Sequence, residues 1–146
     1  MDTNFKKIHI GSFIKQKTVE LEMDILRICN FMKCNSNEVQ EMFLKNDLST
    51  DVLLRWSKLL EYDFFRLYSQ HLILYSPQTR NNSTDTERVS KLPYFKKNIY
   101  TREIIEYMLE LIHSGEMTKQ QVVEKYRIPK TTLFKWIAKY NKEKTE

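Results

Sequence analysis

The sequence predicts an all-α protein in which a flexible linker joins an N-terminal five-helix bundle to a C-terminal three-helix domain. Its 146 residues include only two glycines and three prolines, the residues that interrupt helices most strongly. Apolar residues recur at helical spacing on both sides of residues 76–98. Residues 76–98 are themselves polar, contain two of the prolines and lack this spacing, which is typical of a linker. We therefore expect two small domains, over residues 1–75 and 99–146.

Five helical segments are predicted in the N-terminal block. The first begins after Gly11-Ser12 and extends to Leu21, the second covers residues 25–32, and the third ends near Leu44. The fourth has Leu53, Trp56, Leu59 and Leu60 on one face. The fifth covers residues 64–75. Asn35 or Ser36 is suited to cap the third helix, and Thr50 or Asp51 the fourth.

Three helices are predicted in the C-terminal block. Thr101 is suited to cap the first, and Gly115 to form the left-handed turn that ends it. Thr118, followed three residues later by Gln121, is a capping-box pair at the start of a short second helix. After a turn that contains Arg127, Ile128 and Pro129, the last helix runs over residues 130–140.

The last two helices have an apolar and a polar face. The residues spaced to meet one another and the preceding helix are Val122, Tyr126, Ile128, Leu133, Trp136 and Ile137. The residues left on the outward surface are Lys119, Gln120, Lys130, Thr131, Thr132, Lys135 and Lys139. Phe134 has two interpretations: it packs on a sugar or thymine, or it is buried against the linker.

This arrangement is that of a helix-turn-helix, in which the second helix enters the major groove of DNA and the first crosses the phosphate backbone. On this geometry Thr131 and Thr132 would contact base edges or a thymine methyl group. Lys130 would reach a guanine edge or a phosphate, and the other four polar residues would contact phosphates.

Basic charge is concentrated in the same segment. The chain has a net charge of +5, yet residues 1–75 hold ten basic and ten acidic residues. Residues 118–142 hold seven lysines and arginines against Glu124 alone. Such a basic element is typical of a surface that faces a polyanion. A solvated helix face is the alternative interpretation of the same charges.

Residues 99–141 resemble the helix-turn-helix at the start of transposase-type proteins, which are encoded beside or within insertion elements. The matching residues are Tyr100, Gly115-Glu116-Met117-Thr118, Val122, Tyr126, Ile128 and Thr131-Thr132-Leu133-Phe134-Lys135-Trp136. Arg127 stands where that family has glycine in the turn, and Val123 where it has a small residue at the helix crossing. The resemblance implies double-stranded DNA as the partner. It does not imply catalysis, because the chain has no room for the metal-binding α/β core of a transposase.

Residues 10–68 resemble the phage-repressor-like helix-turn-helix family, particularly in residues 10–15 and 53–60. In that family the third helix reads DNA, usually with Ser, Arg, Thr or Gln. The corresponding residues here are Ser36, Asn37, Glu38, Gln40 and Glu41. Because the two carboxylates would repel phosphates, we expect this half to keep the bundle without strong affinity for DNA.

An aromatic cluster near the end of the N-terminal block has two interpretations. Its members are Phe64, Phe65, Tyr68 and Tyr75. They are either core residues or a partly exposed surface through which the bundle forms a homodimer.

No catalytic or metal site is predicted. Cys29 and Cys34 lack the further ligands that a zinc site needs. His9, His71 and His113 are scattered, and the sequence shows no Cys or Ser nucleophile in an evident turn. Two glycines cannot form a glycine-rich phosphate loop, so we expect neither a cofactor nor a small-molecule substrate.

The expected location is the cytoplasm, in association with the nucleoid and without membrane contact. No run of about 18 apolar residues exists, and residues 1–12 lack the pattern of a signal peptide. The predicted function is sequence-specific DNA binding by a transcription regulator or by the recognition subunit of a mobile element. The alternative is a protein-interaction adaptor or oligomerisation module with only non-specific affinity for DNA. An enzyme is a third hypothesis, for which no residues are found.

Overall fold

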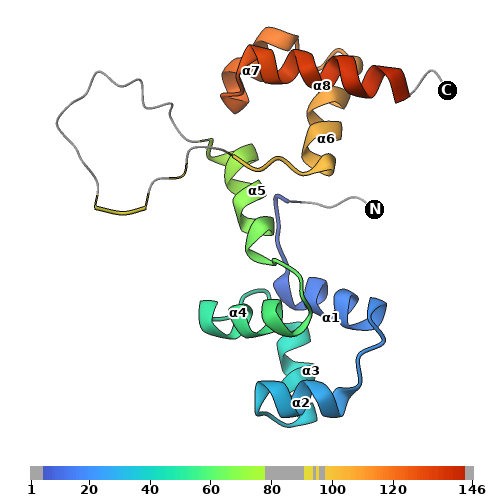
Figure 1. Cartoon of the computed structure of the whole chain (residues 1–146), viewed down its shortest axis with the longest axis vertical. Helices are drawn as coiled ribbons and strands as arrows, with labels where there is room; N and C mark the ends of the chain where they lie inside the picture. Colours follow the sequence, from blue (N-terminus) through green and yellow to red (C-terminus); the bar gives the residue numbers. More distant parts are fainter. Residues whose placement is uncertain (1–4, 78–90, 94, 96–97, 144–146) are drawn as a thin grey trace. The chain divides into compact units, whose positions relative to one another are not determined.

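A computed structural model describes residues 5–77, 91–93, 95 and 98–143 of the chain (Figure 1). Within these residues the chain forms eight α-helices and no strand, which confirms the predicted all-α class. None of the helices described is both long and apolar enough to cross a membrane. The chain divides into two compact units, Asp2–Tyr68 and Ser69–Glu146, which are called here the N-terminal unit and the C-terminal unit.

The N-terminal unit is a set of short helices around a small apolar core. It contains α1 (Ile10–Glu20), α2 (Ile25–Met32), α3 (Ser36–Leu44), α4 (Thr50–Leu59) and the first residues of α5 (Phe65–Tyr75). The side chains that are least accessible to solvent there are Ile10, Ile14, Ile28, Val39, Trp56, Leu60 and Phe64. Leu53 and Leu59 are buried beside them, so the predicted apolar face of α4 is confirmed.

Side-chain caps define where α3 and α4 begin. Asn35 Oδ1 accepts a hydrogen bond from the Glu38 backbone N–H at 2.9 Å, and Glu38 Oε2 accepts one from the Asn35 N–H at 2.8 Å. This reciprocal pair confirms one of the two predicted caps of α3. The cap predicted for α4 at Thr50 or Asp51 is wrong. Ser49 Oγ accepts from the Val52 N–H at 3.4 Å instead, because three consecutive residues here are suited to capping and the helix uses the first.

Gly11 lies at a close approach between the start of α1 and the end of α3. Helix α1 begins at Ile10, before Gly11 rather than after Gly11-Ser12 as the sequence indicated. The Gly11 N–H donates to the carbonyl of Lys45 at 3.0 Å. A Cβ atom at this position would lie 2.5 Å from the carbonyl oxygens of both Met42 and Phe43. The absence of a side chain therefore allows these two segments to pack together.

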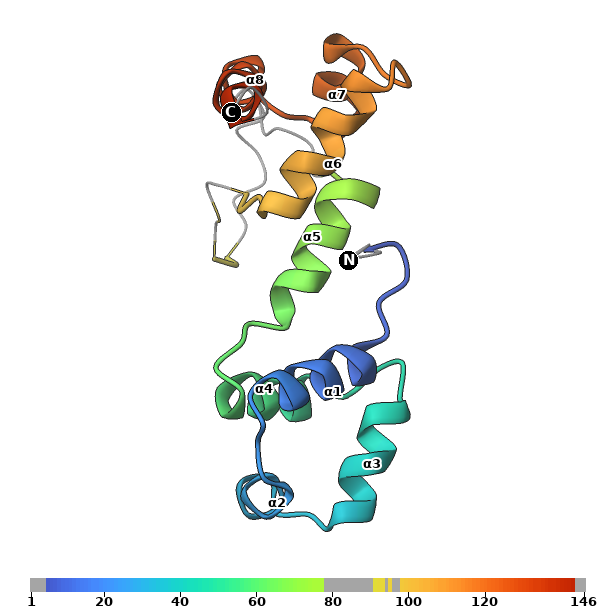
Figure 2. The same cartoon turned by 90° about the vertical axis from the view of Figure 1, so that its right-hand side faces the viewer.

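The C-terminal unit contains the rest of α5 and three further helices. These are α6 (Arg102–His113), α7 (Lys119–Tyr126) and α8 (Lys130–Glu143). Figure 2 shows α8 almost end-on, with α7 and α6 beside it. Its fully buried apolar side chains are Ile104, Met108, Val122, Ile128 and Leu133. From the sequence, all of residues 64–75 were expected to belong with the first four helices, whereas the two compact units divide after Tyr68.

Gln70 connects α5 to the segment that leads into α6. Its side chain is 1% exposed. Its Nε2 donates to the carbonyl of Ile99 at 2.5 Å, and its Oε1 accepts from the backbone N–H of Thr101 at 3.1 Å. Thr101 is in turn the N-cap of α6, as predicted. One buried amide thus satisfies two backbone groups directly before the helix. Of the predicted linker, residues 76–98, most lie outside the described residues.

Among the residues that the structure describes, five at or near helix ends adopt positive φ angles. Gly115 (φ 78°) follows α6, as predicted. The other four are not glycines: Glu22 (φ 47°) near the end of α1, Lys33 (φ 54°) after α2, Glu61 (φ 49°) near the end of α4, and Arg127 (φ 54°) after α7. Left-handed backbone is therefore used repeatedly in a chain that contains only two glycines.

Candidate nucleic-acid interface

The start of α7 is fixed by a capping box. Thr118 Oγ1 accepts from the Gln121 N–H at 3.1 Å, and Gln121 Oε1 accepts from the Thr118 N–H at 2.8 Å, as the sequence predicted. This cap places Lys119 and Gln120 in the first turn, both exposed. The Gln120 Nε2 donates at 2.6 Å to Oε1 of Glu124, the only carboxylate on α7.

A tight turn joins α7 to α8. Arg127 caps α7 in the left-handed conformation (φ 54°, ψ 42°), at the position where the sequence analysis noted the absence of glycine. A side chain in this conformation costs about 1–2 kcal/mol. The Ile128 side chain is fully buried after the turn, and the carbonyl of Pro129 accepts from the N–H groups of Thr132 and Leu133. The buried Ile128 is therefore the anchor that holds the turn in place.

The predicted apolar face of the two helices divides into buried and half-buried residues. Val122, Tyr126, Ile128 and Leu133 are buried. Trp136 and Ile137 are only half-buried. The Trp136 ring meets the Tyr100 ring edge-on, with centroids 5.0 Å apart. The indole is thus covered on one side by the segment before α6.

Tyr126 has the largest pKa shift in the described part of this unit. Its ring is 3% exposed. Burial, together with the neighbouring Tyr107 and a hydrogen bond with the Tyr107 side chain, raises the pKa of Tyr126 well above its ordinary value. The hydroxyl therefore remains protonated in the folded unit under conditions in which an exposed tyrosine ionises.

This raised pKa predicts a loss of stability at alkaline pH. The unfolded chain releases the Tyr126 proton near pH 10, while the folded unit retains it. The contribution of the Tyr126 hydroxyl to the free energy of unfolding is therefore fully present below about pH 10. It falls as the pH rises above that value. Urea unfolding, followed by Trp136 fluorescence in a Trp56→Phe background at several pH values, measures the slope of the unfolding free energy against pH. Tyr126→Phe should reduce that slope, and an unchanged slope in this variant would contradict the assignment.

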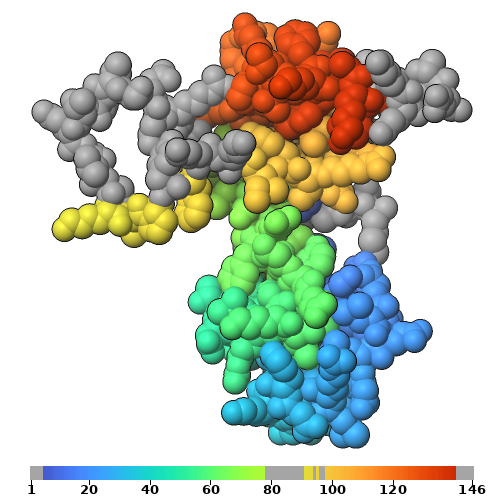
Figure 3. Space-filling model, in the orientation of Figure 1, coloured from blue at the N-terminus to red at the C-terminus, as the bar shows by residue number. Residues whose placement is uncertain are grey.

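The polar face of α7 and α8 holds the residues that the sequence singled out. Six of the seven are exposed: Lys119, Gln120, Lys130, Thr131, Lys135 and Lys139. Thr132 is half-buried, because it lies one turn before Trp136 on the edge of the apolar face. Residues 130–140 contain three lysines and no acidic residue. Figure 3 shows α8 in red on the side of the C-terminal unit that is turned to the viewer.

Phe134 and Ala138 also belong to this face. A contact of Phe134 with a sugar or thymine was one of its two interpretations, whereas Ala138 was not singled out. Phe134 is 53% exposed. The Lys119 ammonium lies 5.6 Å from the centre of its ring, so the start of α7 borders the middle of α8. Ala138 is exposed as well. The signal was available in the sequence, since Thr131, Phe134, Lys135 and Ala138 have the spacing of one helix face.

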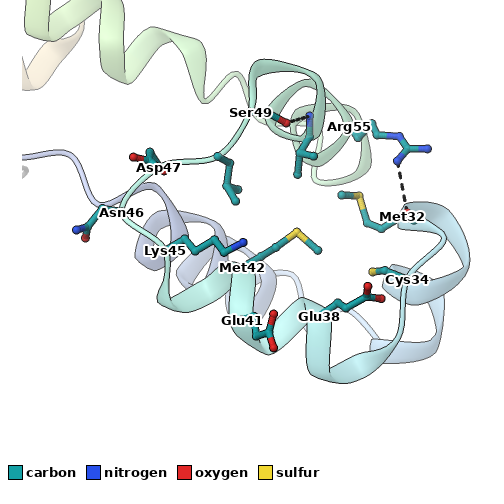
Figure 4. Close-up of a pocket in the computed structure, with 12 residues that line it drawn as sticks. Met32, Cys34, Glu38, Glu41, Met42, Lys45, Asn46, Asp47, Ser49 and Arg55 are labelled. Carbon is teal, nitrogen blue, oxygen red and sulfur yellow. Dashed lines mark hydrogen bonds between the residues drawn. The ribbon is translucent and has the colours of Figure 1, made fainter.

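The corresponding surface of the N-terminal unit has a different charge. A groove of about 740 Å³ runs between the end of α2, α3 and α4 (Figure 4). Its lining includes the carboxylates of Glu38, Glu41 and Asp47, together with Lys45 and Arg55. Three acidic groups against two basic ones leave this surface without the positive charge that α8 has.

The two cysteines have the properties of structural thiols. Cys29 and Cys34 are free and half-buried. Burial, and next the neighbouring Cys29, raises the pKa of the Cys34 thiol, which disfavours the thiolate that acts as nucleophile or metal ligand. In the described ranges no group of three or more His, Cys, Asp or Glu side chains is placed to hold a metal ion.

Comparison of the chain with known protein families, curated proteins and solved structures gives no significant match.

Proposed function

We propose that this chain is a sequence-specific double-stranded DNA-binding protein without a catalytic domain of its own, either a transposase-like helix-turn-helix protein or a transcription regulator. The observation that supports the proposal is the exposed face of α7 and α8, on which Lys119, Lys130, Lys135 and Lys139 are all exposed. Since α8 has no carboxylate between residues 130 and 140, this face attracts a polyanion along its length.

The proposed arrangement follows from the helix positions. In it, α8 lies in the major groove, with Thr131 near the bases, and α7 crosses the phosphate backbone at Lys119. The repressor-like N-terminal unit contributes little DNA affinity, because Glu38 and Glu41 are exposed on α3, the helix that would have to enter the groove. Residues 76–98 act as the linker, and the protein resides in the cytoplasm on the nucleoid.

The salt dependence of binding tests this proposal. The affinity of the full chain for duplex DNA, measured by fluorescence anisotropy, should fall steeply with salt concentration. Each of Lys130→Ala, Lys135→Ala and Lys139→Ala should reduce the log–log slope by about one, because each removes one phosphate contact.

Lys58→Ala is the matched control, since Lys58 is an exposed lysine on α4 of the N-terminal unit. It should leave the slope unchanged. An affinity that does not vary with salt, or equal slopes in all four variants and the parent chain, would contradict the proposal. Selection of bound oligonucleotides by the full chain would then give the target sequence, and an enriched palindrome would indicate a dimer.

A second candidate function is that of a protein-interaction adaptor or oligomerisation module. It is favoured by the large apolar side chains that the N-terminal unit exposes, among them Val19 and Leu26, each 67% exposed, and Leu44, 78% exposed. A homodimer formed through this unit would dissociate on Leu44→Lys if Leu44 lies in the contact. Sedimentation equilibrium of the full chain distinguishes the two states, and a parent chain that is already monomeric would contradict the homodimer.

A further inference from the structure

The outward face of α8 has an apolar line between basic edges. Thr131, Phe134 and Ala138 are all exposed and lie at spacings of three, four and seven residues, so their side chains are neighbours on one helix face. Lys130 lies one turn before Phe134 on one side, while Lys135 and Lys139 lie on the other side. Lys119 of α7 approaches the Phe134 ring at 5.6 Å. A phenyl ring thus stands in the middle of a surface that otherwise carries positive charge.

The partner of this face must combine negative charge with a small apolar group. The lysines favour a polyanion, since α8 has no acidic residue between positions 130 and 140 that would offset their charge. The edges of the base pairs in the major groove present hydrogen-bond donors and acceptors and a single kind of apolar group, the C5-methyl of thymine. The thymine methyl is therefore the one apolar group in the major groove that an aromatic ring can contact.

We propose that Phe134, with the methyl groups of Thr131 and Ala138, contacts thymine C5-methyl groups in the major groove and makes the chain selective for thymine-containing sites. The small side chain of Ala138, one turn after Phe134, allows the helix surface to approach the bases. This inference rests on the proposed function, because it names the base that the same surface reads.

Replacement of thymine by deoxyuridine tests the contact directly, because it removes the methyl group and keeps base pairing and hydrogen bonding. The probe is the duplex enriched by selection with the full chain, with its thymines replaced one at a time. Loss of a contacted methyl should weaken binding about fourfold, the ratio that corresponds to about 0.8 kcal/mol for one buried methyl-sized group at 298 K. At the thymine that the phenyl ring contacts, Phe134→Ala should bind the thymine and deoxyuridine duplexes equally.

Two controls separate this contact from folding and from DNA binding in general. Phe134→Ala should keep the parent salt slope, and its melting temperature should stay within about 3 °C of the parent value, because an exposed side chain contributes little to stability. Phe31→Ala, which removes an exposed phenylalanine of α2, should keep the thymine preference.

The outcomes are distinct. A parent chain that binds both duplexes equally and with the same steep salt dependence would overturn the thymine contact and leave the proposed function intact. An enriched site without thymine would do the same. Absence of salt-dependent binding to any duplex, or tighter binding to an acidic protein or to RNA of the same sequence, would overturn both.

Discussion

Gly11→Ala is expected to destabilise the N-terminal unit by about 2–3 kcal/mol. The added Cβ would lie 2.5 Å from the Met42 and Phe43 carbonyl oxygens and 2.7 Å from that of Lys45. All three are backbone atoms, so no side chain can rotate away, and the end of α3 must move from α1. Alanine has a better helix propensity by about 1 kcal/mol, which offsets only part of this overpacking.

The measurement uses the fact that each unit contains one tryptophan, Trp56 or Trp136. In a Trp136→Phe background the remaining fluorescence follows the N-terminal unit during urea unfolding. Gly115→Ala is the control at the chain's other glycine, and its effect on the C-terminal unit is followed by Trp136 fluorescence in a Trp56→Phe background. No atom lies within 4 Å of a Cβ placed there, so the cost is only that of a side chain at a φ of +78°, about 1–2 kcal/mol. Equal effects of the two substitutions on the units that contain them would contradict the steric explanation.

Gln70→Leu is expected to destabilise the C-terminal unit by about 2–4 kcal/mol. Leucine preserves most of the buried volume but removes both hydrogen bonds of the amide. The carbonyl of Ile99 and the N–H of Thr101 then lose their side-chain partners, at about 1–3 kcal/mol for each group that stays shielded from water. Since Thr101 caps α6, the loss should also loosen the first turn of that helix.

In a Trp56→Phe background, Trp136 fluorescence reports on the unfolding of this unit. Gln120→Leu is the matched control, because the Gln120 amide forms its hydrogen bond with Glu124 on the exposed side of α7. It should change stability by no more than about 0.5 kcal/mol. If Gln70→Leu is equally mild, the buried amide does not hold the segment before α6.

The features that sequence reasoning predicted well are those encoded within a few residues. The capping box of Thr118 and Gln121 spans four residues, and the cap at Thr101 and the turn at Gly115 are equally local. The position of α5 was not predictable in the same way. Its hydrogen bonds from Gln70 reach residues 29 and 31 positions away, and no local pattern indicates such a partner.

The candidate site shows the same contrast. Helix spacing placed Lys130, Lys135 and Lys139 on the outward face of α8, where the structure has them exposed. Spacing also assigned Trp136 to the core, but how far a ring is covered depends on the segment that contacts it, in this case Tyr100. For Phe134 the choice between exposure and burial likewise required the three-dimensional arrangement.

The four left-handed residues that are not glycines have a consequence for how the chain can vary. Glycine at Glu22, Lys33, Glu61 or Arg127 would relieve about 1–2 kcal/mol of backbone strain. It would also enlarge the conformational entropy of the unfolded chain, at a cost of about 0.4–1 kcal/mol. Because these two effects largely cancel, the interaction of the side-chain charge with the helix dipole decides whether glycine or the present residue is more stable at each position. A cation at a helix C-terminus is favourable, as at Lys33 and Arg127. The carboxylates of Glu22 and Glu61 are unfavourable there, because the C-terminal end of a helix carries partial negative charge.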